Sequence, residues 1–148
     1  MITKSARRRP SRAARSFGYT IAVVLNAILL HLVNVNPGWD AVPVLTEDTS
    51  QVLLLVNVSL VAGIVANVVY VLYDPPRFKA LGDLVTTSIS LAVLLRIWVV
   101  FPFAIDAREW TLLARTVLVV AMVGTAVAML VQAVTATGLT GRSASRPA

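Results

Sequence analysis

The sequence predicts an all-α integral membrane protein, a bundle of four transmembrane helices. Three observations lead to this fold class: four long apolar stretches, the absence of Asp and Glu from all four, and an uneven division of charge between the segments that join them. A membrane-spanning helix needs about 20 mostly apolar residues, and each stretch meets or approaches that length. The stretches cover residues 17–35, 51–73, 84–105 and 111–134.

The composition leaves no room for a separate soluble domain. Hydrophobic residues make up 57% of the 148 residues and charged residues only 14%. The chain has no cysteine, and its single histidine, His31, has no carboxylate neighbours in the sequence for a zinc site. We therefore expect no metal ion and no cofactor. The excess of Arg over Lys, together with abundant Ala, Val and Leu, indicates a bacterial inner-membrane protein.

The charges predict how the chain is oriented in the membrane. Basic residues precede the first stretch, lie between the second and third, and follow the fourth, whereas the other two loops are mainly acidic. The positive-inside rule then places both termini in the cytoplasm. This topology accounts for the net charge of +6, so no nucleic-acid partner is expected. Residues 1–16 and 137–148 are expected to be disordered cytoplasmic tails on a transmembrane domain of residues 17–136, with the basic N-terminal tail on anionic lipids.

Turn-forming residues predict where the helices begin and end. Asn36-Pro37-Gly38 ends the first helix, and Asp74-Pro75-Pro76 stops the second. Asp83 is expected to cap the start of the third helix, and Pro102 to kink or end it. Gly138 is expected to cap the end of the fourth. The first stretch is expected to be an uncleaved anchor, because it is longer than the apolar core of a signal peptide.

Arg96 is the strongest candidate for a functional residue, because it lies near the middle of the third stretch. An arginine at the centre of a membrane helix costs about 2.5–3.5 kcal/mol on insertion scales, so a partner is expected. One interpretation is a side chain that extends along the helix to outer-loop acids or lipid phosphate. The other is an anion or substrate site. Arg115, close to the start of the fourth stretch, is expected at the membrane interface.

Three further polar residues lie within the stretches. His31 is expected to form a hydrogen bond between helices, with a pH-sensing role as the alternative. Asn57 lies roughly opposite Ser59 on the second helix and should therefore contact a different neighbouring helix. Asn67 lies further along the same helix. The candidate intramembrane polar site comprises Arg96, His31, Asn57, Arg115 and Asn67.

Small residues at helical spacing indicate where helices approach one another closely. Such rows allow close packing in membranes and polar contacts across it, either within one chain or between subunits. The predicted packing residues are Ser59, Gly63 and Ala66 on the second helix and Ala121, Gly124 and Ala128 on the fourth.

These features favour a non-enzymatic protein that acts through helix packing, as an accessory subunit or a homo-oligomer in a larger membrane complex. Nothing in the sequence forms a nucleophile–base pair, a phosphate-binding loop or a metalloprotease helix. The alternative is an oligomeric pore or carrier that favours anions, with Arg96 and His31 facing a shared outer vestibule.

Overall fold

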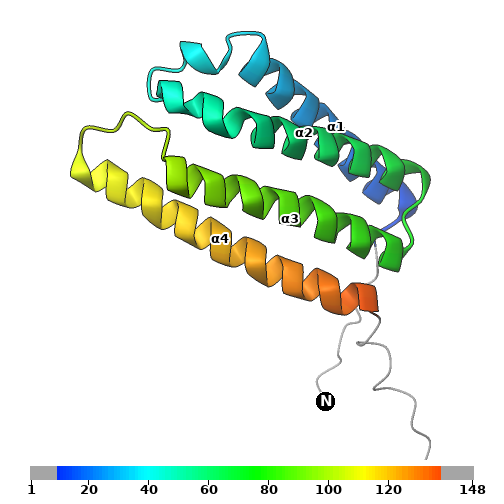
Figure 1. Cartoon of the computed structure of the whole chain (residues 1–148). Coiled ribbons are helices and arrows are strands. Elements are labelled where there is room, and N and C mark those ends of the chain that lie inside the picture. Colours follow the sequence, from blue (N-terminus) through cyan, green and yellow to red (C-terminus); the bar gives the residue numbers. More distant parts are fainter. Residues whose placement is uncertain (1–9, 138–148) are drawn as a thin grey trace, which may run out of the picture.

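The computed structural model describes residues 10–137, and this part of the chain is all-helical (Figure 1). Its four long helices are each long and apolar enough to span a membrane, which makes the chain a multi-pass membrane protein by length and composition and is consistent with a helical bundle. The helices are α1 (Arg12–Asn34), α2 (Ser50–Leu72), α3 (Pro76–Val100) and α4 (Arg108–Thr137). Two short 3₁₀ helices, η1 (Trp39–Ala41) and η2 (Glu47–Thr49), lie between α1 and α2.

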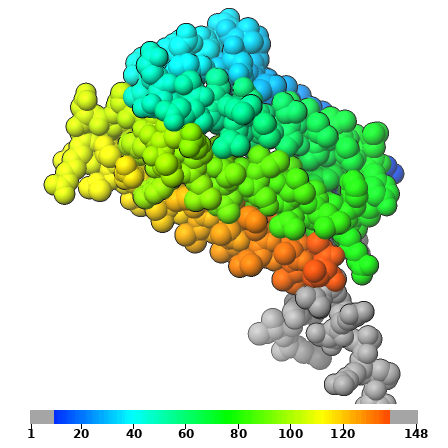
Figure 2. All heavy atoms as spheres, viewed as in Figure 1, coloured from blue at the N-terminus to red at the C-terminus, as the bar shows by residue number. Residues whose placement is uncertain are grey.

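The four helices run up and down and pack in chain order. Extensive contacts join α1 to α2, α2 to α3 and α3 to α4, and Figure 2 shows α2, α3 and α4 as adjacent bands on one face. Helices α1 and α4 therefore form the two edges of the arrangement (Figure 1). Few of the described residues are buried: Gly38, Thr49, Val52, Tyr70, Ala80, Pro102 and Leu118. Most apolar side chains point outward, as membrane-spanning helices require.

The two ends of the helices differ in how they are connected. The end that carries segments 35–49 and 101–107 is called the loop end here. The opposite end holds the short connection between α2 and α3 and is called the terminus end, since both ends of the described chain lie there (Figure 1).

Helix α3 begins eight residues earlier than the sequence predicts. Pro75 is its N-cap and Pro76 its first residue. At the first position of a helix the backbone N–H has no partner within the helix, so proline loses no hydrogen bond there, and its fixed φ suits the helix. The prediction that Asp83 caps this helix is wrong: Asp83 lies two turns inside it and forms an ion pair with Lys79. The proline pair that ends α2 therefore also starts α3.

The start of α1 also differs from the expected boundary. Residues 12–16, assigned to a disordered tail, are helical, because the Ser11 hydroxyl caps the helix by accepting a hydrogen bond from the Ala14 amide at 3.3 Å. At the other end of the chain, α4 continues to Thr137, and the predicted cap at Gly138 lies outside the described residues.

Two backbone features shape the loop end. Helix α3 ends at Val100, and Phe101 takes the left-handed conformation with φ of 46°. The following residues then pair with the α1–α2 segment, where Leu45 and Phe103 form an antiparallel bridge. The Ala104 amide donates to the Val44 carbonyl at 2.9 Å, and the Thr46 amide donates to the Pro102 carbonyl at 3.1 Å. The two loops are thus joined to each other.

Candidate functional site

Arg96 lies near the loop end of α3, not at its middle. It precedes the last helical residue, Val100, by four residues, or about 6 Å along the axis. Its guanidinium donates to the backbone carbonyl of Gln51 at 3.4 Å and to the Gln51 side-chain oxygen at 3.5 Å. Gln51 in turn donates to Asp48 at 2.8 Å. Arg96 therefore extends toward the loop end and reaches an acid through Gln51, because the earlier start of α3 shifts the whole helix.

Arg115 lies further along its helix than the sequence predicts. It follows Arg108, the first residue of α4, by seven residues, or about 10 Å. Its guanidinium carbon lies 5.0 Å from the ring centre of Trp98 and 4.5 Å from that of Phe101. Both distances suit cation–π attraction. Arg115 thus joins α4 to the end of α3, and the structure does not bring it together with Arg96, which contacts α2.

The polar residues of α2 contact two different helices, as their helical spacing predicts. Asn57 and Asn34 of α1 exchange two amide hydrogen bonds of 2.8 and 2.7 Å. On the other side of α2, the hydroxyls of Ser59 and Ser90 of α3 lie 3.4 Å apart. His31 lies in the last turn of α1 and is exposed.

The small residues of α2 serve both of its neighbours. Gly63 lies against Asn26 of α1, whose side-chain atoms would be 3.2 Å from a Cβ at this position. Ala66 helps to line a cavity between α2 and α3. Asn67 donates to the Gly63 carbonyl at 2.8 Å, a bond within its own helix.

The small residues of α4 divide in a similar way. Ala121 and Ala128 lie on the less exposed side of the helix with buried Leu118, and α3 is the helix that α4 packs against. Gln132 continues this side, with its side-chain oxygen buried and no partner among the described residues. Gly124 is exposed, and a Cβ there would have no neighbour within 4 Å. Gly124 therefore does not pack against α3 within the chain, and its predicted role in packing between subunits stays a prediction.

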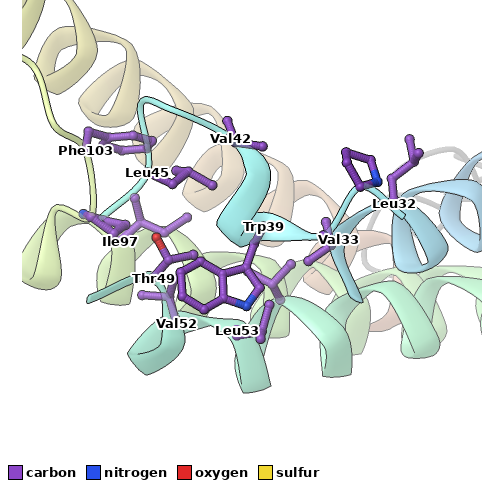
Figure 3. A pocket seen from close by; sticks show the side chains of 14 residues that line it. Leu32, Val33, Trp39, Val42, Leu45, Thr49, Val52, Leu53, Ile97 and Phe103 are labelled. Carbon is purple, nitrogen blue, oxygen red and sulfur yellow. The ribbon is translucent and has the colours of Figure 1, made fainter. Parts of the chain in front are cut away.

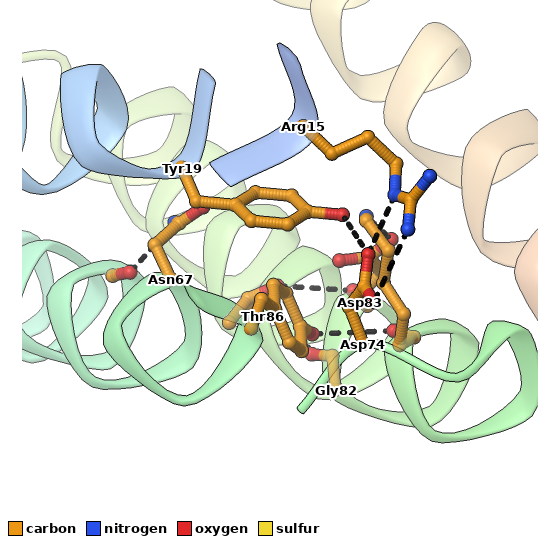
Figure 4. Close-up of polar contacts among 10 residues, drawn as sticks. Arg15, Tyr19, Asn67, Asp74, Gly82, Asp83 and Thr86 are labelled. Carbon is orange, nitrogen blue, oxygen red and sulfur yellow. Dashed lines mark hydrogen bonds and ion pairs between the residues drawn. The ribbon is translucent and has the colours of Figure 1, made fainter. Parts of the chain in front are cut away.

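A polar and aromatic cluster that the sequence analysis missed lies at the terminus end (Figure 4). The terminus cluster comprises Arg15, Tyr19, Tyr70, Asp74, Lys79 and Asp83. The Arg15 Nε lies 2.6 Å from Asp74 Oδ2, and the Tyr19 hydroxyl donates to the same oxygen at 3.4 Å. The Tyr70 hydroxyl donates to the Lys79 carbonyl at 3.2 Å. These contacts connect α1, the α2–α3 connection and α3.

Aromatic contacts fill the space between these charges. The rings of Tyr19 and Tyr70 meet edge to face with centroids 5.6 Å apart, and Lys79 Nζ lies 5.1 Å from the Tyr70 ring centre. Gly82 makes room for Tyr70, because a Cβ there would lie 2.1 Å from the Tyr70 hydroxyl. The positive and negative groups of the terminus cluster pair with one another, which is the pattern of a structural contact.

An apolar cavity lies at the loop end, between the ends of α1, α2 and α3 and beneath the α1–α2 segment (Figure 3). We call it the loop-end cavity; its volume is about 390 Å³. Neither Arg96 nor His31 lines it. Its lining residues are Leu32, Val33, Pro37, Gly38, Trp39, Val42, Leu45, Thr49, Val52, Leu53, Val56, Ile97, Pro102 and Phe103.

Thr49 is a polar side chain of this lining. It is 6% exposed, and its hydroxyl oxygen has no hydrogen-bond partner in residues 10–137.

No family model, curated protein or solved structure matches this chain. The interpretation of the loop-end cavity therefore rests on its own geometry. Residues 10–137 also contain no group of three or more His, Asp or Glu side chains that could hold a metal ion.

Proposed function

We propose that this chain is a non-enzymatic membrane protein that works as one subunit of a larger assembly, with copies of itself or as an accessory to another membrane protein. The observation that carries the proposal is an uncovered face of α4. Its members recur at spacings of four and three residues, the spacing of paired helices. The α4 face comprises Leu113, Val117, Val120, Gly124, Val127 and Val131.

The geometry of the α4 face suits contact with another helix. Its five large side chains are between 51% and 66% exposed, so the rest of the chain leaves this face open. Gly124 lies among them with free space around it. Hydrophobicity alone does not drive helices together in lipid, but a small residue lets a second helix approach closely enough for favourable packing.

The polar residues support a structural role over a catalytic one. Asn57 pairs with Asn34, Arg15 pairs with Asp74, and Arg115 contacts two aromatic rings. Each of these contacts joins two helices or a helix and a connection. The alternative is an oligomeric pore or carrier, which needs Arg96 and His31 to face a common space between copies of the chain. In either case we propose that the chain lies in a bacterial inner membrane with both termini in the cytoplasm.

Cysteine scanning of α4 tests the proposal, and the chain suits it because it contains no cysteine of its own. Single variants at Val120, Gly124 and Val127 are oxidised in native membranes, and the products are separated by mass. We expect cross-linked species from these positions. Ala121→Cys is the matched control, since it lies at the same depth on the side that faces α3, and it should give none.

Native mass spectrometry of the intact complex then separates the two kinds of assembly. A ring or pair of identical copies favours a homo-oligomer, and a second protein in fixed stoichiometry favours an accessory subunit. A chain that is monomeric in mild detergent, with no cross-linking preference for the α4 face, would contradict the proposal.

A further inference from the structure

The loop-end cavity is formed by three helices and both loops. Helices α1, α2 and α3 form its walls, and the α1–α2 segment covers it with Trp39, Val42 and Leu45 (Figure 3). Gly38 permits this path, since its φ of 86° is one that other residues rarely adopt. The bridge between Leu45 and Phe103 holds the cover against the start of the α3–α4 loop. The cavity thus depends on three helices and both loops.

The chemistry of the lining selects an apolar occupant. Its walls are aliphatic and aromatic, so a charged group inside would lose its hydration and gain no partner. The polar groups of the lining side chains are the indole N–H of Trp39 and the Thr49 hydroxyl, which is buried and unpaired. Buried hydroxyls are normally hydrogen-bonded, so an occupant with one acceptor would satisfy the group that the protein leaves unsatisfied.

Size and access point to a long molecule from the bilayer. A cavity of about 150 Å³ holds benzene, and this one, at about 390 Å³, falls within the range of ligand sites. Leu32 lines the cavity and is also 41% exposed on α1, so the cavity reaches the surface that lipid contacts. A hydrocarbon chain can therefore enter sideways, between α1 and the loops.

We propose that the loop-end cavity binds one hydrocarbon chain of a membrane phospholipid, with the Thr49 hydroxyl donating to the ester carbonyl. Thr49 directly precedes α2, at the end of an apolar span. In a phospholipid the ester carbonyl likewise lies where the hydrocarbon ends and the headgroup begins. Residues 36–49 carry Asp40, Glu47 and Asp48, and Arg96 lies close by, bonded to Gln51 two residues beyond Thr49. A headgroup with both a phosphate and an ammonium group suits this mixed charge. The favoured lipid is therefore zwitterionic.

Photo-cross-linking tests this proposal on the full chain. The protein is reconstituted in nanodiscs that contain phosphatidylcholine with a photoreactive diazirine on one acyl chain, and the labelled residues are mapped by mass spectrometry. We expect label on Trp39, Val56 and Phe103. Val56→Phe fills the cavity and should lower this label about tenfold. Val58→Phe, on an exposed side of the same helix, is the matched control and should leave it unchanged.

A conservative variant tests the hydrogen bond itself. Thr49→Val keeps the shape of the side chain but removes the hydroxyl, and it should lower cavity labelling by about threefold to tenfold. It also keeps the test decisive if Val56→Phe fails to fold, which circular dichroism detects. Phosphatidylglycerol with the same photoreactive chain should label less than phosphatidylcholine.

Several results would overturn the proposal. Equal labelling of the wild type and both cavity variants would place the lipid elsewhere. Label spread evenly over Val56 and exposed Val58 would show a general lipid coat. A co-purified apolar compound other than a phospholipid, seated in the cavity, would replace the proposed occupant.

Discussion

The two ends of this helix arrangement are held together by different chemistry. At the terminus end, the Arg15–Asp74 ion pair and the edge-to-face rings of Tyr19 and Tyr70 join α1 to α2 and the α2–α3 connection, and Gly82 of α3 lets Tyr70 pack closely. At the loop end, the Asn34–Asn57 and Arg96–Gln51 hydrogen bonds join the same three helices, the two loops join each other, and a cavity of about 390 Å³ remains between them. The terminus end also has cavities, of about 420 Å³ between α3 and α4 and about 260 Å³ between α2 and α3, but helix residues alone line them, whereas the α1–α2 segment helps to line the loop-end cavity.

This difference predicts where the chain is sensitive to substitution. The close contact between Tyr70 and Gly82 makes added volume costly at that point of the terminus end. The loop end has space to accept new groups, and its polar contacts are spread over separate pairs. Four substitutions, given in order of decreasing effect on stability, test the comparison.

Gly82→Ala should have the largest effect. The new Cβ would lie 2.1 Å from the Tyr70 hydroxyl and 3.0 Å from the ring carbon that carries it, so the buried ring must move. Overpacking of this kind costs about 1–3 kcal/mol of unfolding free energy. Thermal unfolding in detergent, followed by circular dichroism, measures it. Gly18→Ala is the control, because nothing lies within 4 Å of its Cβ. Equal stability of the two variants would show that Tyr70 is not confined.

Asp74→Asn should destabilise the terminus end more than Asp83→Asn does, because it removes the acceptor that Arg15 and the Tyr19 hydroxyl share. The Arg15 and Asp74 side chains are 20% and 17% exposed, so water screens their attraction only partly. Asp83→Asn breaks the more exposed pair within α3 and should cost only about 0.3–0.5 kcal/mol. If the two variants lose the same stability, the Arg15–Asp74 ion pair stabilises the fold no more than the Lys79–Asp83 pair within α3 does.

Asn57→Ala should weaken the contact between α1 and α2 by about 0.6 kcal/mol and by no more than about 1.7 kcal/mol, the average and the maximum measured for hydrogen bonds between membrane helices. Asn67→Ala is the matched control on the same helix, because its amide bonds only to Gly63 of its own helix. Denaturant unfolding in mixed micelles compares them. A larger loss from the Asn67 variant would contradict the observed pairing.

Arg96→Leu should have the smallest effect, below about 0.5 kcal/mol, because its hydrogen bonds to Gln51 of 3.4 and 3.5 Å are long. We also expect anion flux through liposomes containing the protein to be the same for this variant and the wild type. A wild-type flux that the variant loses, while it still folds and assembles, would favour the pore alternative.

Features that depend on local pattern were predictable from the sequence. The four spans follow from hydropathy, and the separate neighbours of Asn57 and Ser59 follow from the helical period. The start of α3 was missed because Pro76 was interpreted only as a helix stop, although proline is also favoured at the first helical position. With the helix bounds as observed, Arg96 lies near the loop end of α3 and not at the middle of the helix.

Features that depend on distant contacts were not predictable. Arg15 and Asp74 are separated by 59 positions, and no spacing rule pairs them. The loop-end cavity depends on where segment 35–49 comes to lie, which is determined by its bridge to Phe103. The Pro, Trp and apolar residues of that segment were the only sequence signal of a cover.

The bridge between Leu45 and Phe103 also limits how the molecule can move. The chain consists of two helical hairpins, α1–α2 and α3–α4, which the backbone joins at the terminus end. At the loop end, the Ala104–Val44 and Thr46–Pro102 hydrogen bonds join them a second time. The two hairpins are therefore joined at both ends, and they cannot separate at the loop end until those two hydrogen bonds break.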